Sequence, residues 1–226
     1  MMSIHPYWLI IASSMFALIP VGLALVTSYM KVSIVLGMLR SGLGTPQVPS
    51  GSVIMALSFA LTAFIMAPVA KESAEIIASQ KLPSFKESPS LQSLKSLILI
   101  LDPWKKFMNS QAGESEKRFF REMRMSFLKK AGKPLDDEGE GDLPKTLQIV
   151  LPAFVFSELK EAFAMAFVVL LPFLIIDLVV ANILVGLGMY MVSPVMISLP
   201  LKLFLFVGSD AWMFLARGLV ESYQIT

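Results

Sequence analysis

The sequence predicts an all-α integral membrane protein in which two long helical hairpins flank a water-exposed helical insert. Hydrophobic residues make up 55 % of the 226 residues, above the roughly 45 to 50 % of soluble domains. Residues 7–30, 41–70 and 178–201 carry no charge, and each exceeds the about 20 residues that cross a hydrocarbon core. Residues 71–145 hold 14 of the 19 Lys and Arg and 12 of the 17 Asp and Glu, which places the polar material between the apolar runs.

The first hairpin is expected over residues 1–79, with arms at about 7–42 and 52–79. Two prolines and two glycines within residues 43–51 interrupt any helix and predict the connection between the arms. A cleaved signal peptide is the alternative for the start of the chain. Residues 1–6 contain no Lys or Arg and the apolar run is too long for one, so we expect this segment to be retained.

The insert is expected over residues 80–145 as amphipathic helices in water. Ser90 can cap a helix whose leucines recur at helical spacing, and Asp102 followed by Pro103 predicts the start of another short helix. A further helix is predicted at about 114–130, where apolar and charged residues occupy different faces. The acidic residues 136–142 are too polar and too flexible to pack, and we expect a loop.

The second hairpin is expected over residues 146–226, with arms at about 157–185 and 197–221. Its turn lies in a Met-rich loop, residues 186–196, where glycines permit unusual backbone angles and a proline restarts the chain.

Charged residues inside this hairpin are the candidate functional side chains. Asp177 and Lys202 each stand alone among apolar neighbours, where an unpaired charge costs about 2.5 to 3.5 kcal/mol at a helix centre. We expect an ion pair within or between chains that acts in assembly, with a proton or ion relay as the alternative. Glu158 and Lys160, after a possible Ser157 cap, predict a helix start, with a partner contact as the second reading.

Composition excludes several functions. The chain has no cysteine and one histidine, His5, so disulfides, thiolate metal sites and His-based triads lack the necessary residues. We expect no catalytic residue, no metal and no cofactor, and therefore no enzyme. No stripe of Lys and Arg predicts nucleic acid as a ligand.

Several separated segments carry a resemblance to a known family. They are Thr27-Ser28-Tyr29-Met30-Lys31 with Leu39-Arg40, Leu43-Gly44 and Gln47-Val48-Pro49; Pro152-Ala153-Phe154 with Ser157-Glu158-Leu159-Lys160 and Ala162-Phe163; residues 172–178; residues 188–194; and residues 199–203 with Asp210-Ala211-Trp212. Together they resemble the SctR/FliP family, the export-gate subunit common to virulence injectisomes and flagella. Many relatives have three consecutive methionines where this chain has Met189-Tyr190-Met191, and Asp-Gly-Trp where it has Asp210-Ala211-Trp212. Lys31 and Ser193 are more similar to the injectisome branch.

The resemblance implies a core subunit of the type III protein-export gate. Five copies would assemble with two smaller related subunits into a pore for unfolded secreted proteins, in the bacterial inner membrane, as a multi-pass part of the secretion basal body. Met189, Tyr190 and Met191 would seal the pore, because flexible thioethers and one ring make a narrow apolar constriction. Filling of a core is the plainer reading of this turn. The alternative function is an ion-coupled membrane transporter that uses Asp177 and Lys202.

Overall fold

Every regular element of the described structure is a helix. The computed structural model describes residues 13–14, 22, 24–45, 49–79, 91–132 and 143–223. Its helices are α2 (Tyr29–Leu43), α3 (Gly51–Ser79), α4 (Leu91–Gln111), α5 (Glu114–Lys130), α6 (Leu143–Gly186), α7 (Pro194–Gly208) and α8 (Ala211–Glu221). These ranges contain no strand, and the all-α prediction is confirmed. Most of the uncharged run at residues 7–30 and the acidic loop at 136–142 lie outside the described residues.

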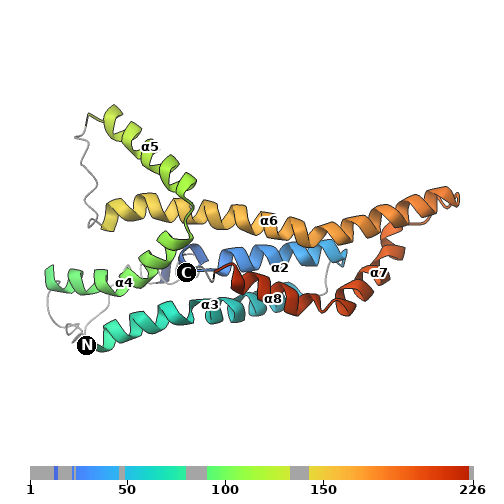
Figure 1. Cartoon of the computed structure of the whole chain (residues 1–226), viewed down its shortest axis with the longest axis horizontal. Coiled ribbons are helices and arrows are strands. Elements are labelled where there is room, and N and C mark those ends of the chain that lie inside the picture. The colour runs from blue at the N-terminus through green and yellow to red at the C-terminus, as the bar shows by residue number, and fades with distance from the viewer. Residues whose placement is uncertain are drawn as a thin grey trace.

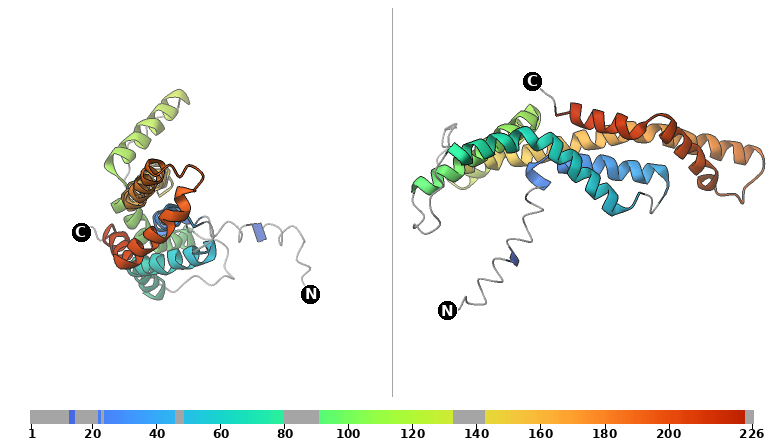
Figure 2. Two further views of the ribbon diagram at one scale, coloured as in Figure 1. Left: turned by 90° about the vertical axis from the view of Figure 1, so that its right-hand side faces the viewer. Right: turned by 90° about the horizontal axis from the view of Figure 1, so that it is seen from below.

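The molecule is long and narrow, with α6 running along most of its length (Figure 1). α2 packs on both α6 and α3. α7 returns from the far end of α6, and α8 continues back along the body, as the right-hand view of Figure 2 also shows. α4 and α5 lie at the end opposite to the turn between α6 and α7, so the insert and the Met-rich loop occupy opposite ends of the molecule (Figure 1).

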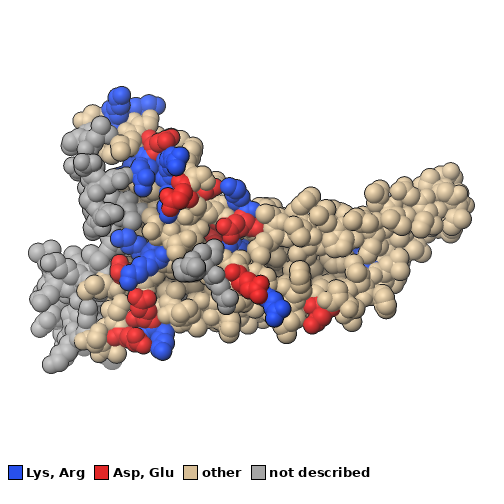
Figure 3. All heavy atoms as spheres, viewed as in Figure 1, with Lys and Arg blue, Asp and Glu red and all other residues tan. Residues whose placement is uncertain are grey.

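Charge follows the same division. Figure 3 shows the Lys, Arg, Asp and Glu side chains gathered over the end that carries α4 and α5, whereas the end formed by α6 and α7 is almost uncharged on the face in view. Two described helices are long and apolar enough to cross a membrane, Gly51–Ser79 and Leu147–Gly186. α7 and α8 pass the same test only as a pair, and they are bent by 62° at the break between them. The uncharged run at 178–201 forms the hairpin turn and not a single span.

The first hairpin is broken where proline and glycine predict it. α2 ends at Leu43, and Gly44 follows in the left-handed conformation at φ 77°, which glycine adopts without a Cβ clash. The amide of Gly44 donates to the carbonyl of Ser41 and closes the last turn. α3 then begins at Gly51 and packs against α2.

The insert differs from the prediction in its first helix. Residues 91–111 form one helix, so the second helix start predicted at Asp102 and Pro103 is wrong. A proline removes one backbone hydrogen bond, and contacts with α3 hold the helix across that gap. Trp104 Nε1 donates to Ser73 Oγ at 3.1 Å, and this hydroxyl lies 3.4 Å from the carbonyl oxygen of Ile100. α5 has the predicted bounds, and Gly132 follows it at φ 64°.

α6 begins earlier than predicted and passes through its expected start. It runs unbroken for 44 residues from Leu143, so the cap predicted at Ser157 is wrong. Ser157 Oγ instead donates to the carbonyl of Ala153 one turn back, at 2.8 Å, and accepts the backbone amide of Gly113 at 2.8 Å. A serine hydroxyl can cap a helix start or donate to the carbonyl four residues earlier inside a helix. The sequence around the serine does not distinguish the two cases.

The return arm predicted at 197–221 is two helices, α7 and α8. Asp210 between them has φ 49°, the positive value that an L-residue rarely adopts. The main core lies between α2, α3, α6, α7 and α8, and a second core lies between α4 and α6. The buried residues of the main core are Val32, Val35, Leu36, Leu39, Leu43, Ile54, Ile65, Ala162, Ala166, Phe173, Phe206, Leu215 and Leu219.

Candidate functional site

The Met-rich loop projects from the uncharged end of the molecule. Gly188, at φ 74°, follows the end of α6 at Gly186, and the amide of Met189 donates to the carbonyl of Leu184 at 2.9 Å. This bond is part of a C-terminal cap that satisfies carbonyls of the last turn of α6. Met189, Tyr190 and Met191 are 44 %, 78 % and 99 % exposed. Within the part of the chain that the structure describes, these three side chains belong to neither hydrophobic core.

Asp177 and Lys202 meet at the base of this projecting hairpin. Lys202 Nζ lies 2.6 Å from Asp177 Oδ2 and donates to the carbonyl of Gly42 at 3.0 Å. Ser198 Oγ donates to Asp177 Oδ1 at 2.6 Å. Lys202 and Ser198 are buried, whereas the Asp177 side chain is 35 % exposed. The two isolated charges thus form one polar cluster that joins α6, α7 and the end of α2, where unpaired carbonyls attract a cation.

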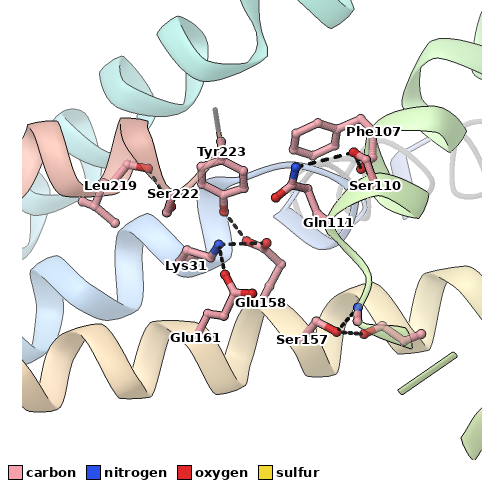
Figure 4. Close-up of polar contacts among 12 residues, drawn as sticks. Lys31, Phe107, Ser110, Gln111, Ser157, Glu158, Glu161, Leu219, Ser222 and Tyr223 are labelled. Atoms are coloured by element: carbon pink, nitrogen blue, oxygen red, sulfur yellow. Dashed lines mark hydrogen bonds and ion pairs between the residues drawn. The ribbon is translucent and has the colours of Figure 1, made fainter. Parts of the chain in front are cut away.

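A second cluster lies deeper in the body, between α2, α6 and the end of α8 (Figure 4). Lys31 Nζ lies 3.1 Å from Glu158 Oε1 and 2.7 Å from Glu161 Oε2. The hydroxyl of Tyr223 donates to Glu158 Oε2, and the Lys31 ammonium stands 4.0 Å from the centre of the Tyr223 ring. Lys31 and Glu158 are fully buried. The cluster therefore joins three segments, and the Lys31–Glu158 ion pair at its centre is shielded from water.

The sequence prediction included only part of this second cluster. Glu158 was a candidate, but Lys31 and Tyr223 were not. Lys31 ends an uncharged run of 24 residues, so its isolation was a usable signal of the kind that identified Asp177. Nothing in the sequence around Tyr223 indicates its role, because its partner lies 65 residues away.

Lys160 was predicted to act in assembly or as a buried charge, and it is not buried. Its side chain is 74 % exposed and its ammonium lies 3.2 Å from Glu116 Oε1 of α5. Hydrogen bonds from Ser115, from the Glu116 backbone and from Lys160 hold the pKa of Glu116 below its usual value. Helical geometry explains the exposure, since Glu158 faces α2 and a residue two positions later points away from it. A role of Lys160 in assembly stays a prediction.

No metal centre is present among the residues that the structure describes, which contain no group of three or more His, Asp or Glu placed to hold an ion. The polar clusters join helices by ion pairs and hydrogen bonds. What distinguishes the molecule is thus an exposed apolar turn on a hairpin whose base is fixed by buried charge.

Sequence similarity extends over nearly the whole chain. The sequence matches the FliP family over residues 12–219. It is 35 % identical to the hypersensitivity response secretion protein HrcR of Ralstonia nicotianae over 96 % of both chains. It is 36 % identical to the Yop proteins translocation protein R of Yersinia pestis over 95 % of both chains. It is also 38 % identical to the flagellar biosynthetic protein FliP of Pectobacterium carotovorum, over 91 % of this chain and 74 % of that protein. With this extent of similarity, the chain belongs to the FliP family.

Proposed function

We propose that this chain is a core subunit of the type III protein-export gate and that several copies surround a pore for unfolded secreted proteins. The observation that carries the proposal is the exposed turn of Met189, Tyr190 and Met191 at the end of an apolar hairpin. The family supplies the coarser statement: the chain is a membrane component of a protein secretion apparatus and not an enzyme. The injectisome branch is our preference, supported by Lys31 and Ser193.

Assembly with further chains is the second part of the proposal. Large apolar side chains of α6 and α7 are exposed along the hairpin, including Ile175, Leu178, Phe204 and Val207. Contiguous apolar surface of this kind is covered by lipid or by protein. The irregular backbone of the turn favours protein, because non-helical backbone at membrane depth is tolerated only where protein buries it or water lines it. We infer a homo-oligomer, with five copies and two smaller related subunits as the family resemblance implies.

The turn would then act as a seal. Turns from several copies place thioethers and phenol rings around one axis, and an apolar constriction of this kind can exclude ions by dewetting. Methionine has three rotatable bonds, so the ring can yield to a passing polypeptide and close behind it. A multi-pass location in the bacterial inner membrane, within a secretion basal body, follows from this role. It is supported by the two described helices that are long and apolar enough to span a bilayer.

Conductance of the assembled complex tests the seal. Replacement of Met189, Tyr190 and Met191 by Ala should raise ion leakage while the complex still assembles. The chain offers a matched control, because Met123, Met125 and Phe127 are also two methionines and one exposed aromatic, on α5. Their replacement by Ala should leave conductance unchanged. Unchanged conductance in an assembled triple variant of the turn would refute the seal, and loss of assembly would support a packing role for the turn.

The ion-coupled transporter is less well supported than the export pore. Both carboxylate oxygens of Asp177 already have partners in this chain, Ser198 and Lys202. A transported ion would therefore compete with a buried cation for this carboxylate. We propose instead that Asp177 and Lys202 act in assembly by fixing the base of the hairpin, with the half-exposed carboxylate facing a neighbouring subunit.

A further inference from the structure

The projecting hairpin has a weakened helix on each of its two arms. Pro172 lies inside α6 and Pro200 lies inside α7. A proline deletes the hydrogen bond to the carbonyl four residues earlier, so each arm has lost one backbone bond near the base. Kinks in helices form at such positions. Between the two prolines, Phe173 is the one residue that belongs to a described core, and no residue of 178–199, hereafter the tip, does.

Asp177 bridges the weak point in α7. Its two oxygens accept hydrogen bonds from Ser198, two residues before Pro200, and from Lys202, two residues after it. The same carboxylate therefore spans the missing backbone bond and joins α7 to α6. Lys202 extends the connection to the body, because its ammonium also donates to the carbonyl of Gly42 in α2. The polar cluster is thus the one described set of hydrogen bonds that joins the two arms and the body at this level of the hairpin.

We propose that the tip is a hinged unit, with Pro172 and Pro200 as the hinges, and that Asp177 sets its angle to the body. With both oxygens engaged, the tip is held in the observed orientation. When the carboxylate loses either donor, the tip turns about the two prolines as one piece, since α6 and α7 remain packed on each other. The exposed edge of Asp177 is where a cationic group of another chain can compete for this carboxylate.

The inference goes beyond the proposed pore, because it concerns motion within one chain. Distances between pairs of spin labels, measured on the full chain in detergent, test this inference. The chain contains no native cysteine, so labels attach only at the introduced cysteines. Labelled chains are diluted into an excess of unlabelled chains, so that only distances within one copy are recorded. One pair, at Lys71 of α3 and Leu187, reports tip against body. A second pair, at Val179 and Ile197, reports the tip alone; all four positions are exposed.

Asp177→Ala should broaden the distance distribution of the tip-against-body pair and leave the pair within the tip narrow. Asp177→Asn, which keeps the shape and one acceptor oxygen, should broaden it less, and it replaces the alanine variant if that chain does not fold. Glu221→Ala, which removes an exposed acid from a surface ion pair, should change neither distribution.

Pro172→Ala and Pro200→Ala added to Asp177→Ala should narrow the tip-against-body distribution again, because both helices regain a backbone bond. An unchanged tip-against-body distribution in the Asp177 variants would overturn the hinge. Equal broadening of both distance distributions would also overturn it, because the tip itself would then be unfolding. Failure of the proline substitutions to narrow the distribution overturns the assignment of the hinges. These distance measurements do not depend on conductance. If the proposed seal were refuted, the result for the hinge would be unaffected.

Discussion

Removal of the buried Lys31 ammonium should destabilise the chain more than removal of an exposed lysine. In Lys31→Met the carboxylate of Glu158 stays buried and loses the buried ammonium that lies 3.1 Å from it. A charge left unpaired in a protein interior is disfavoured, because neither water nor a partner solvates it. Methionine is unbranched like lysine and adapts to irregular packing, so the lost charge is the main change.

The size of the effect follows from burial. Breaking a buried ion pair from one side costs about 3 to 5 kcal/mol. Tyr223 still donates a hydrogen bond to Glu158, which places the expected loss near the lower end, about 3 kcal/mol. The contact with Glu161 adds little, since that side chain is half-exposed. For a chain of this length 1 kcal/mol shifts the unfolding midpoint by about 2 to 4 °C, so the midpoint should fall by roughly 6 to 12 °C.

Thermal unfolding in a fixed concentration of detergent measures the shift. Lys106→Met is the matched control, because Lys106 makes a 3.3 Å ion pair with Glu72 on the surface and should change the stability by about 0 to 1 kcal/mol. The variant Lys31→Met, Glu158→Leu, Tyr223→Phe removes every buried polar partner and should recover most of the loss. The reasoning fails if Lys31→Met unfolds like the Lys106 control, or if the triple variant is less stable than Lys31→Met.

Three further predictions concern the same clusters and the insert. Tyr223→Phe keeps the ring beneath the Lys31 ammonium but removes a hydrogen-bond donor from the buried Glu158 carboxylate. It should lower the free energy of unfolding, measured by denaturant titration, by about 1 to 3 kcal/mol. A loss below about 0.5 kcal/mol would contradict this role of Tyr223. Asp177→Asn and Lys202→Met should weaken the oligomer band in native electrophoresis, and normal assembly with normal export in both variants would end the assembly proposal. Single cysteines at Ser115 and Ser126 should react with a membrane-impermeant maleimide applied from the correct side, whereas one at Leu174 should not; the reverse pattern would show that the insert does not lie in water.

Local signals in the sequence predicted the elements that local chemistry determines. Proline and glycine within residues 43–51 interrupt the chain whatever surrounds them, and Gly132 ends α5 by adopting a conformation that other residues avoid. The isolation of Asp177 and Lys202 among apolar residues predicted a paired charge because desolvation is costly at any position in such a run.

Long-range partners decide what the sequence could not predict. Ser157 bonds to the amide of Gly113, 44 residues away, and helix α6 passes through a segment that has all the marks of a helix start. The break before α8 depends on Asp210 at a positive φ, where neither neighbour is proline or glycine. Glu158 stands in a cluster of charges that predicted a helix start, and its pairing with Lys31 exists only after α2 packs on α6.

The length of α6 limits how this chain can sit in a bilayer. The apolar part of the helix, Leu147–Gly186, has 40 residues, and at 1.5 Å per residue it is about 60 Å long. A hydrocarbon core is about 30 Å thick, and transmembrane helices tilt by about 20° on average and rarely beyond 40°. Tilt alone cannot bring such a helix within the core, so close to half of its length must stand outside the lipid. The exposed apolar side chains on the part of α6 outside the lipid therefore need another protein chain to cover them.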